Sequence, residues 1–147
     1  MKDVCLMKQG LALGALRRAN VDRLPTFKNR HGEPAHSQPD GSDWSPAQWL
    51  QATVGELGEF ANIRKKYERG DLSHAEYSQL AAKELADVQT YLDLLALRAL
   101  DFADGTPHPA GVDLSDATIA KFNEVSERVG SPVRLGESRA YRVPDVR

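Results

Sequence analysis

The 147-residue sequence has a single cysteine, Cys5, so no disulfide can form within the chain and a reducing compartment is expected. No apolar run approaches the roughly 18–20 residues that a membrane-spanning helix needs. The first nine residues carry two Lys and one Asp with no clean apolar region after them, which is not the pattern of a signal peptide. These absences predict a cytoplasmic protein that does not bind membranes.

The sequence also lacks an excess of positive charge, because its net charge is −2. General binding to nucleic-acid polymers depends on neutralising phosphates with Lys and Arg, so that class is not favoured. A Gly-rich phosphate loop, a Cys/His zinc cluster and a Gly-x-Ser-x-Gly motif are absent as well. The length and a hydrophobic fraction of 41% fit one soluble domain, residues 1–147, with a real core.

Apolar residues recur at helical spacing in four segments, which predicts an all-α fold, a helical bundle of about four helices. Residues 4–20 form the first segment and end with basic side chains. Residues 21–43 are rich in Pro, Gly, Asn and Ser and predict a long irregular loop that is either mobile or functional. The loop contains Glu33 and His36, but the Pro34 between them argues against a helical pair of metal ligands.

Two capping signals mark the second and third helices. Ser45 and Ser73 are each followed three residues later by Gln or Glu, the capping-box pattern, and they predict helices over 46–69 and from 73 to about 102. The third helix is apolar on nearly all sides from Leu92 to Leu100. Such a helix is buried all round, and so small a chain has too few other helices to cover it. We therefore expect the chain to assemble with copies of itself.

Residues 114–129, with Asp113 as cap and Gly130 as terminator, predict the fourth helix. Residues 131–147 show no clear periodicity and hold four Arg. They predict an extended tail.

Two carboxylate pairs lie in the middle of the second and third predicted helices. Glu56 and Glu59 are three residues apart, as are Glu84 and Asp87, so each pair projects from one helix face. Like charges at this spacing repel by a few tenths of a kcal/mol. Four carboxylates on neighbouring helices suit a hard cation such as Mg²⁺, with Mn²⁺ as a substitute. The same spacing also occurs on solvated helix faces, and the spacing alone leaves both interpretations open.

The context of these pairs resembles the all-α nucleoside triphosphate pyrophosphohydrolases, the MazG-like superfamily, and especially its small stand-alone and phage-type members. The resemblance rests on Gly55–Asn62, Lys83–Val88 and Lys121–Arg128, and it covers about residues 44–135. It implies a helical bundle that assembles as a dimer or tetramer. It also implies Mg²⁺-dependent cleavage of a (deoxy)nucleoside triphosphate to the monophosphate and pyrophosphate.

The resemblance implies roles for particular residues. The metal ligands would be Glu56, Glu59, Glu84 and Asp87. Glu56 or Glu59 would accept the proton of the attacking water. The cations that stabilise the transferred group would be Lys121 and, less directly, Lys65 and Lys66. Substrate contacts beyond the phosphates would come from Asn123, Trp49, Tyr91 and the 21–43 loop.

Three alternatives compete with this interpretation. A dUTP- or dUDP-selective relative would share the same metal chemistry. A non-enzymatic helical interaction module would carry the carboxylates as surface groups. A di-iron bundle requires His three residues after a carboxylate, but Asn62 and Thr90 occupy those positions.

Overall fold

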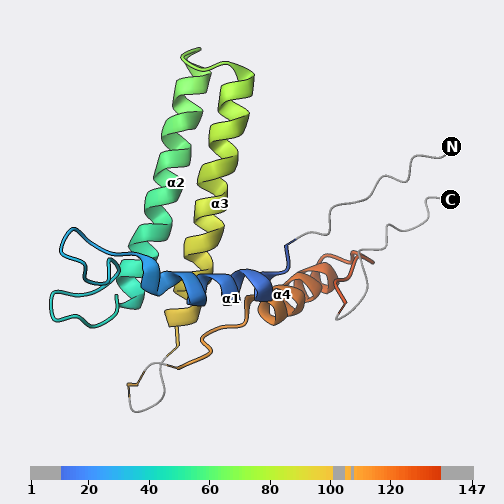
Figure 1. Ribbon diagram of the computed structural model, residues 1–147. Helices are drawn as coiled ribbons and strands as arrows, with labels where there is room; N and C mark the ends of the chain where they lie inside the picture. The colour runs from blue at the N-terminus through green and yellow to red at the C-terminus, as the bar shows by residue number, and fades with distance from the viewer. Residues whose placement is uncertain (1–10, 101–104, 107, 137–147) are drawn as a thin grey trace, which may run out of the picture.

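The computed structural model describes residues 11–100, 105–106 and 108–136, and within them the chain is all-α with four α-helices, as predicted. Figure 1 shows α2 (Pro46–Glu68) and α3 (His74–Arg98) as a long antiparallel pair. α1 (Leu13–Arg23) crosses the base of this pair, and α4 (Leu114–Arg128) lies at the same end in contact with α1. None of the described helices is long and apolar enough to cross a bilayer.

The predicted caps begin three of the helices. Ser45 accepts a hydrogen bond from the backbone N–H of Gln48, whose side chain accepts one in return from the N–H of Ser45. Ser73 and Glu76 form the same capping box at the start of α3. Asp113 accepts two backbone N–H bonds at the start of α4. Each cap stabilises its helix by about 0.5–2 kcal/mol.

The first helix differs from its predicted span of residues 4–20. The part of that span before residue 11 lies outside the described residues, and α1 continues to Arg23 instead of ending at Asn20. The Asn20 side chain is buried and bonded to α3, so it does not compete for the hydrogen bonds of its own helix. Pro25, which has no N–H to donate, then ends α1 in a short 3₁₀ turn, η1 (Leu24–Thr26).

The predicted irregular loop is shorter than expected and runs over residues 27–45. It contains two tight turns, each closed by an isolated bridge, one between Lys28 and Pro34 and the other between Ser37 and Asp43. Asp43 also pairs with Arg98 at the end of α3. The loop is therefore fastened to the base of the helix pair.

The third helix ends at Arg98, earlier than the predicted residue 102. Val112 lies back against the end of this helix, where its backbone N–H donates to the Ala96 carbonyl at 2.8 Å. Gly111, with φ of 58°, lies so close that a Cβ there would stand 2.4 Å from the Ala96 oxygen. Only glycine fits this approach.

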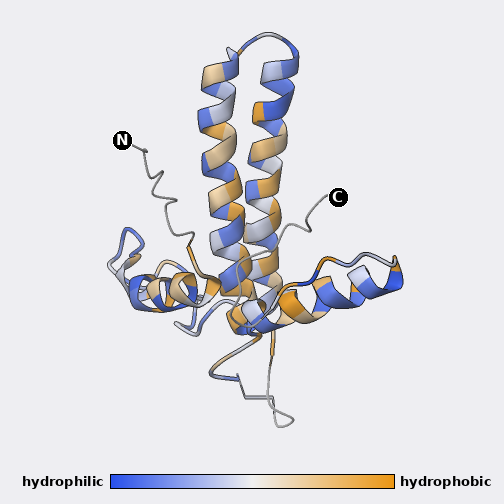
Figure 2. Ribbon diagram, turned by 90° about the vertical axis from the view of Figure 1, so that its right-hand side faces the viewer, coloured by the Kyte–Doolittle hydropathy of each residue, from blue (hydrophilic) through white to orange (hydrophobic). Residues whose placement is uncertain are grey.

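One chain leaves much apolar surface uncovered. Among the described residues, the buried apolar side chains are few: Trp49, Ile63, Ala81, Leu94, Ala96 and Leu97. Leu50 and Val54 of α2 are 51% and 56% exposed, and Leu92 of α3 is 39% exposed. Figure 2 shows orange, apolar segments along both long helices. Burial all round the end of α3 is therefore not reached within a single chain.

Candidate active site

Two glutamates lie in the contact seam between α2 and α3. Residues that are not fully exposed recur every three or four positions on both helices, the spacing of helices packed along their length. The rows are Trp49, Thr53, Glu56, Phe60 and Ile63 on α2, and Ala81, Glu84, Val88 and Tyr91 on α3. Glu56 and Glu84 thus take positions whose neighbours in the rows are mostly apolar.

Three carboxylates converge at this point. Glu56, Glu84 and Asp87 each place one oxygen within 4.8 Å of an oxygen from the other two. No ion pair among the described residues includes any of them. Burial raises the pKa of Glu56, and the neighbouring charges of Glu59, Asp87 and Glu84 raise it further. The cluster is negative charge without a basic partner, and its all-oxygen donor set fits a hard divalent cation.

Glu59, the fourth predicted metal ligand, lies outside this triplet. It is exposed on the next turn of α2, where its charge still raises the pKa of Glu56. Three of the four predicted ligands are therefore brought together by two helices, and the fourth stands beside them.

A pocket of about 300 Å³ opens next to the carboxylates. It is lined by Arg23, Phe27, His36, Glu56, Asp87, Thr90, Tyr91 and Leu94. Burial raises the pKa of Tyr91, as do the charges of Glu56 and Asp87, whereas Arg23 opposes the shift. Tyr91 thus lines the same hollow as the carboxylates, as its position four residues after Asp87 predicts.

Trp49 lies behind this pocket and does not line it. Its side chain is 0% exposed and stacks on His36, with ring centroids 5.2 Å apart. Phe27 and Trp44 meet the edges of the same imidazole at 5.3 and 4.8 Å. Burial lowers the pKa of His36, although the charge of Asp43 opposes the shift. The ring is therefore neutral near pH 7. Trp49 therefore positions His36, which in turn forms part of the pocket wall.

The predicted basic and amide residues lie elsewhere in the chain. Lys65 and Lys66 are exposed in the last turns of α2, with Lys65 about 9 Å further along the axis than Glu59. Lys121 pairs with Glu124 on α4 at 2.6 Å. None of these Lys residues lines the pocket.

Asn123 is engaged in holding the chain that follows α4. Its amide donates to the Leu135 carbonyl and accepts from the Leu135 N–H, both at 2.8 Å. Residues 131–136 are thereby fastened to α4. The rest of the predicted tail lies outside the described residues.

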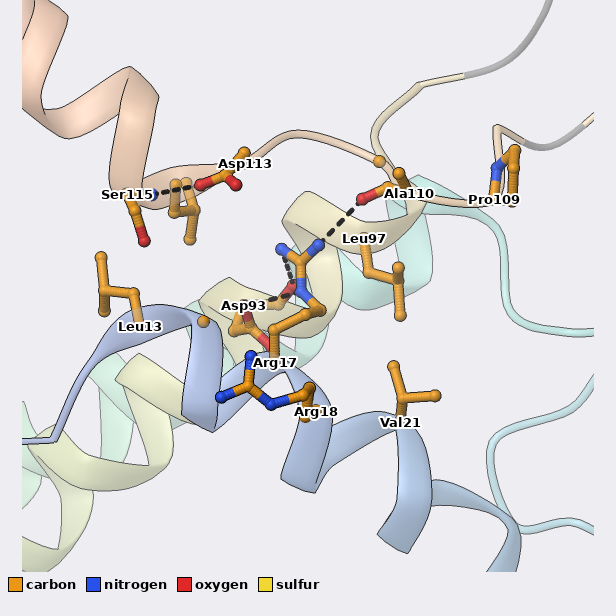
Figure 3. A pocket seen from close by; sticks show the side chains of 13 residues that line it. Leu13, Arg17, Arg18, Val21, Asp93, Leu97, Pro109, Ala110, Asp113 and Ser115 are labelled. Carbon is orange, nitrogen blue, oxygen red and sulfur yellow. Dashed lines mark hydrogen bonds and ion pairs between the residues drawn. The ribbon is translucent and has the colours of Figure 1, made fainter. Parts of the chain in front are cut away.

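Two further hollows are poorer candidates. One of about 350 Å³ lies between α1, the end of α3 and the start of α4, and Figure 3 shows the Arg17 side chain projecting into it. Another of about 610 Å³ runs along α4 and is mainly apolar. Neither contains a member of the Glu56–Glu84–Asp87 triplet.

The sequence named the 21–43 range as a source of substrate contacts, and Arg23, Phe27 and His36 from that range line the pocket, but none of the three was singled out by itself. Arg23 lies on one face of α1 with Arg17 and Asn20, each three residues from the next. This spacing is a signal that the sequence contains. His36 carries no comparable signal, because the loop around it has no periodicity.

No family model matches the chain, and searches of curated proteins and of solved structures find no match either.

Proposed function

We propose that the protein is a Mg²⁺-dependent pyrophosphohydrolase that converts a (deoxy)nucleoside triphosphate to the monophosphate and pyrophosphate. The observation that carries the proposal is the convergence of Glu56, Glu84 and Asp87 from two helices beside a pocket. The resemblance of the surrounding motifs to the MazG-like superfamily supplies the reaction. Such an enzyme would serve housekeeping of the nucleotide pool in the cytoplasm.

The energetics of the seam support a functional role. Charged groups taken out of water between two helices cost free energy, and like charges repel in addition. Apolar residues at positions 56 and 84 would pack the helix pair better. Two glutamates at these positions therefore weaken the pair unless a cation offsets their charge.

The metal ligands in this proposal are Glu56, Glu84 and Asp87, with Glu59 beside them. When bound, Mg²⁺ would offset the charge of the substrate phosphates and increase the acidity of a water molecule. Glu56 or Glu59 would take the proton as water attacks phosphorus. An ionised carboxylate is a competent proton acceptor. Glu56 belongs to the cluster, and Glu59 is exposed on the next turn of α2.

The pocket offers contacts for the rest of the nucleotide. His36, Tyr91 and Phe27 line the pocket, so a base or sugar bound there would lie against aromatic side chains. The volume is at the low end of the range of about 300–1,000 Å³ for small-molecule sites. One chain would therefore enclose only part of a nucleotide.

Assembly of two or four copies would complete the site. The uncovered apolar residues of α2 and α3 supply the surface for it. Lys121, on α4, is apart from the carboxylates of its own chain. Its proposed role therefore requires α4 of another copy. Lys65 and Lys66 would act at the outer end of the site.

The experiment is a panel of ribo- and deoxynucleoside triphosphates and diphosphates with Mg²⁺, in which pyrophosphate and monophosphate are both measured. Equal release of the two products from triphosphates supports the proposal. Cleavage of dUTP and dUDP alone would identify the selective relative. Absence of hydrolysis, together with absence of any Mg²⁺-dependent stabilisation, would identify the non-enzymatic module.

A further inference from the structure

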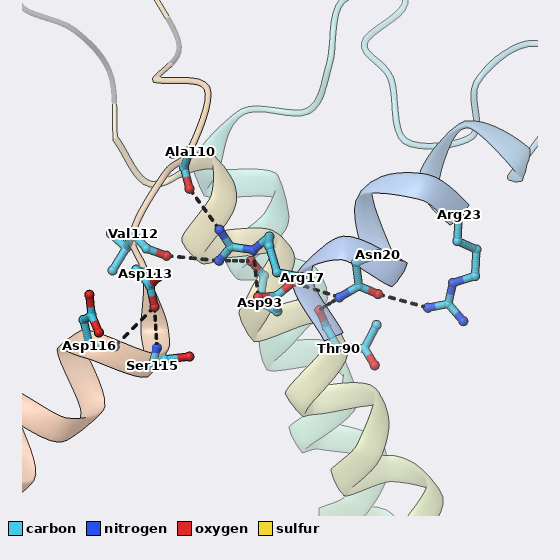
Figure 4. A network of polar contacts seen from close by, with 10 residues as sticks. All are labelled: Arg17, Asn20, Arg23, Thr90, Asp93, Ala110, Val112, Asp113, Ser115 and Asp116. Carbon is cyan, nitrogen blue, oxygen red and sulfur yellow. Dashed lines mark hydrogen bonds and ion pairs between the residues drawn. The ribbon is translucent and has the colours of Figure 1, made fainter. Parts of the chain in front are cut away.

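Three polar residues on one face of α1 belong to a hydrogen-bonded network that leads to the pocket. Arg17, Asn20 and Arg23 follow one another at intervals of three, and Figure 4 shows their side chains along the helix. This network is anchored by Asp93 of α3, whose side chain is only 3% exposed. Arg17 donates to one oxygen of that carboxylate at 2.8 Å, and Asn20 donates to the other at 2.9 Å.

This anchor fixes which way the Asn20 amide points. A carboxylate paired with Arg17 only accepts hydrogen bonds, so Asn20 must present its NH₂ group to Asp93. The same NH₂ group lies 3.4 Å from the Thr90 carbonyl. The amide oxygen therefore faces the opposite way, where it accepts a bond from Nη2 of Arg23 at 3.3 Å.

Arg23 is a cation whose charge is left unpaired at the pocket. It lines the pocket together with Glu56 and Asp87, yet no carboxylate among the described residues forms an ion pair with it. Its guanidinium stands 5.4 Å from the centre of the Phe27 ring, a cation–π arrangement. Within the described part of the chain, the guanidinium contacts Asn20 and Phe27 and forms an ion pair with neither Glu56 nor Asp87.

We propose that Arg23 binds the polyphosphate of the substrate, and that Asn20, with Arg17 and Asp93 behind it, is the residue that positions Arg23. This inference rests on the proposed function. A guanidinium has five N–H donors, and Asn20 occupies one of them, so a fork remains for phosphate oxygens. Collapse of Arg23 onto Glu56 or Asp87 would use the same carboxylate oxygens that a cation needs. Its separation from them leaves both functions available.

The Arg17–Asp93 pair can fasten α1 to α3 without any help from Arg23. Arg17 also donates to the carbonyls of Ala110 and Val112, which ties in the chain before α4. Arg23 is exposed and contributes little to this attachment. Its substitution should therefore change substrate binding and leave the fold in place.

The first test is steady-state hydrolysis of a nucleoside triphosphate by Arg23→Ala, Arg23→Lys and, as control, Arg18→Ala. Arg18 is the exposed arginine beside Arg17 and is not part of the pocket. Arg23→Ala should raise KM about ten- to a hundredfold, the factor that hydrogen bonds to a charged group are worth. Arg23→Lys should recover part of the loss, and Arg18→Ala should match the wild type.

The second test asks whether Asn20 acts through Arg23. Asn20→Ala should raise KM in the wild-type background and have little further effect in the Arg23→Ala background. Far-UV circular dichroism and thermal melting establish that each variant is folded. An equal loss in both backgrounds would show that Asn20 only supports the fold, and it would overturn the positioning role.

The outcomes separate this inference from the proposed function. Wild-type protein that hydrolyses no nucleotide and gains no stability from Mg²⁺ would overturn the proposed function, and this inference with it. Wild-type hydrolysis with unchanged KM in Arg23→Ala would overturn only the role of Arg23. Arg23→Ala that keeps the Mg²⁺-dependent stabilisation but binds triphosphate weakly would support both.

Discussion

Glu56 of α2 and Glu84 of α3 face each other across the seam between the two long helices, where each interrupts a largely apolar row. Their oxygens approach within 4.8 Å, with Asp87 as the third member of the cluster. The packing of the two helices thus brings like charges together at partly buried positions in rows that are otherwise largely apolar. A ligand of opposite charge should therefore stabilise the fold.

The first prediction concerns Glu84→Gln, which keeps the shape of the side chain and removes its charge. Without divalent ions the variant should be more stable than the wild type by up to about 1 kcal/mol, because repulsion in the seam is relieved. Saturating Mg²⁺ should raise the melting temperature of the wild type through preferential binding to the native state. Glu84→Gln should lose most of that rise.

The matched control for this prediction is Glu127→Gln, on the exposed surface of α4. It removes the same charge away from the seam and should keep the full Mg²⁺ response. If Glu84→Gln responds to Mg²⁺ as strongly as the wild type, the ion binds elsewhere.

The second prediction concerns pH and His36. Burial lowers the pKa of this ring below its ordinary value of 6.5, so the unfolded chain takes up the proton first. The stability that the neutral ring confers is complete above pH 6.5 and is lost as the pH falls through the pKa of the folded state. His36→Phe keeps an aromatic ring in the cluster and should reduce the slope of unfolding free energy between about pH 7.5 and pH 5. Urea unfolding across this pH range measures the slope for the wild type and for His36→Phe, and equal slopes would contradict the prediction.

Local signals in the sequence predicted the helices. Ser45, Ser73 and Asp113 act on backbone groups within the first turn that follows them, so short windows contain the whole interaction. The carboxylates of the site were also accessible to this reasoning, because Glu84 and Asp87 share a helix face by spacing alone. What the spacing could not give is the approach of Glu56 from the other helix, which depends on the register of the pair.

The opposite wall of the pocket could not be predicted in the same way. Asn20 finds its partner in Asp93, 73 residues away, and no local pattern records such a bond. Asp93 itself lies within the apolar end of α3, where the sequence indicates only burial. This bond is not visible in the sequence, where Arg17 and Arg18 predict the last turn of a helix that ends at Asn20 and leave Arg23 in the loop.

The third prediction concerns Asn123. Its two bonds to Leu135 are partly buried, so Asn123→Ala should destabilise the chain by about 1–3 kcal/mol. Because the NH₂ group and the oxygen of the Asn123 amide both bind the Leu135 backbone, KM for the nucleotide should stay unchanged. Thr118→Ala, at an exposed position on the same helix, should change stability by less than about 0.5 kcal/mol. A raised KM with unchanged stability would instead assign Asn123 to the substrate.

The fourth prediction concerns assembly. Leu50 is 51% exposed on α2, so Leu50→Glu should be tolerated by a single chain. Loss of buried leucine from an interface between two copies should weaken their association by about a hundredfold or more. Light scattering after gel filtration measures the change. Gln51→Glu adds the same charge at the next exposed position and should leave assembly intact.

The fifth prediction concerns Lys121, which is 64% exposed where it pairs with Glu124. An exposed pair of this kind stabilises by no more than about 1 kcal/mol, so Lys121→Ala should fold normally. It should lower kcat without abolishing the stabilisation by Mg²⁺, because Lys121 is proposed to stabilise the transferred group beside the carboxylate cluster of another copy and is not a metal ligand. Full activity of the variant would remove Lys121 from the site.

Mixing two variants of low activity tests whether the site joins two copies. A hybrid of Lys121→Ala and Glu84→Gln chains contains one site with both native residues and one with neither. Random exchange of subunits makes hybrids of half the dimers, so about a quarter of all sites, and of wild-type activity, should return. If Lys121 acted on the carboxylates of its own chain, every site would carry one of the two substitutions. Mixing would then restore nothing even when hybrids form, and the measured rate would stay at the mean of the separate variants.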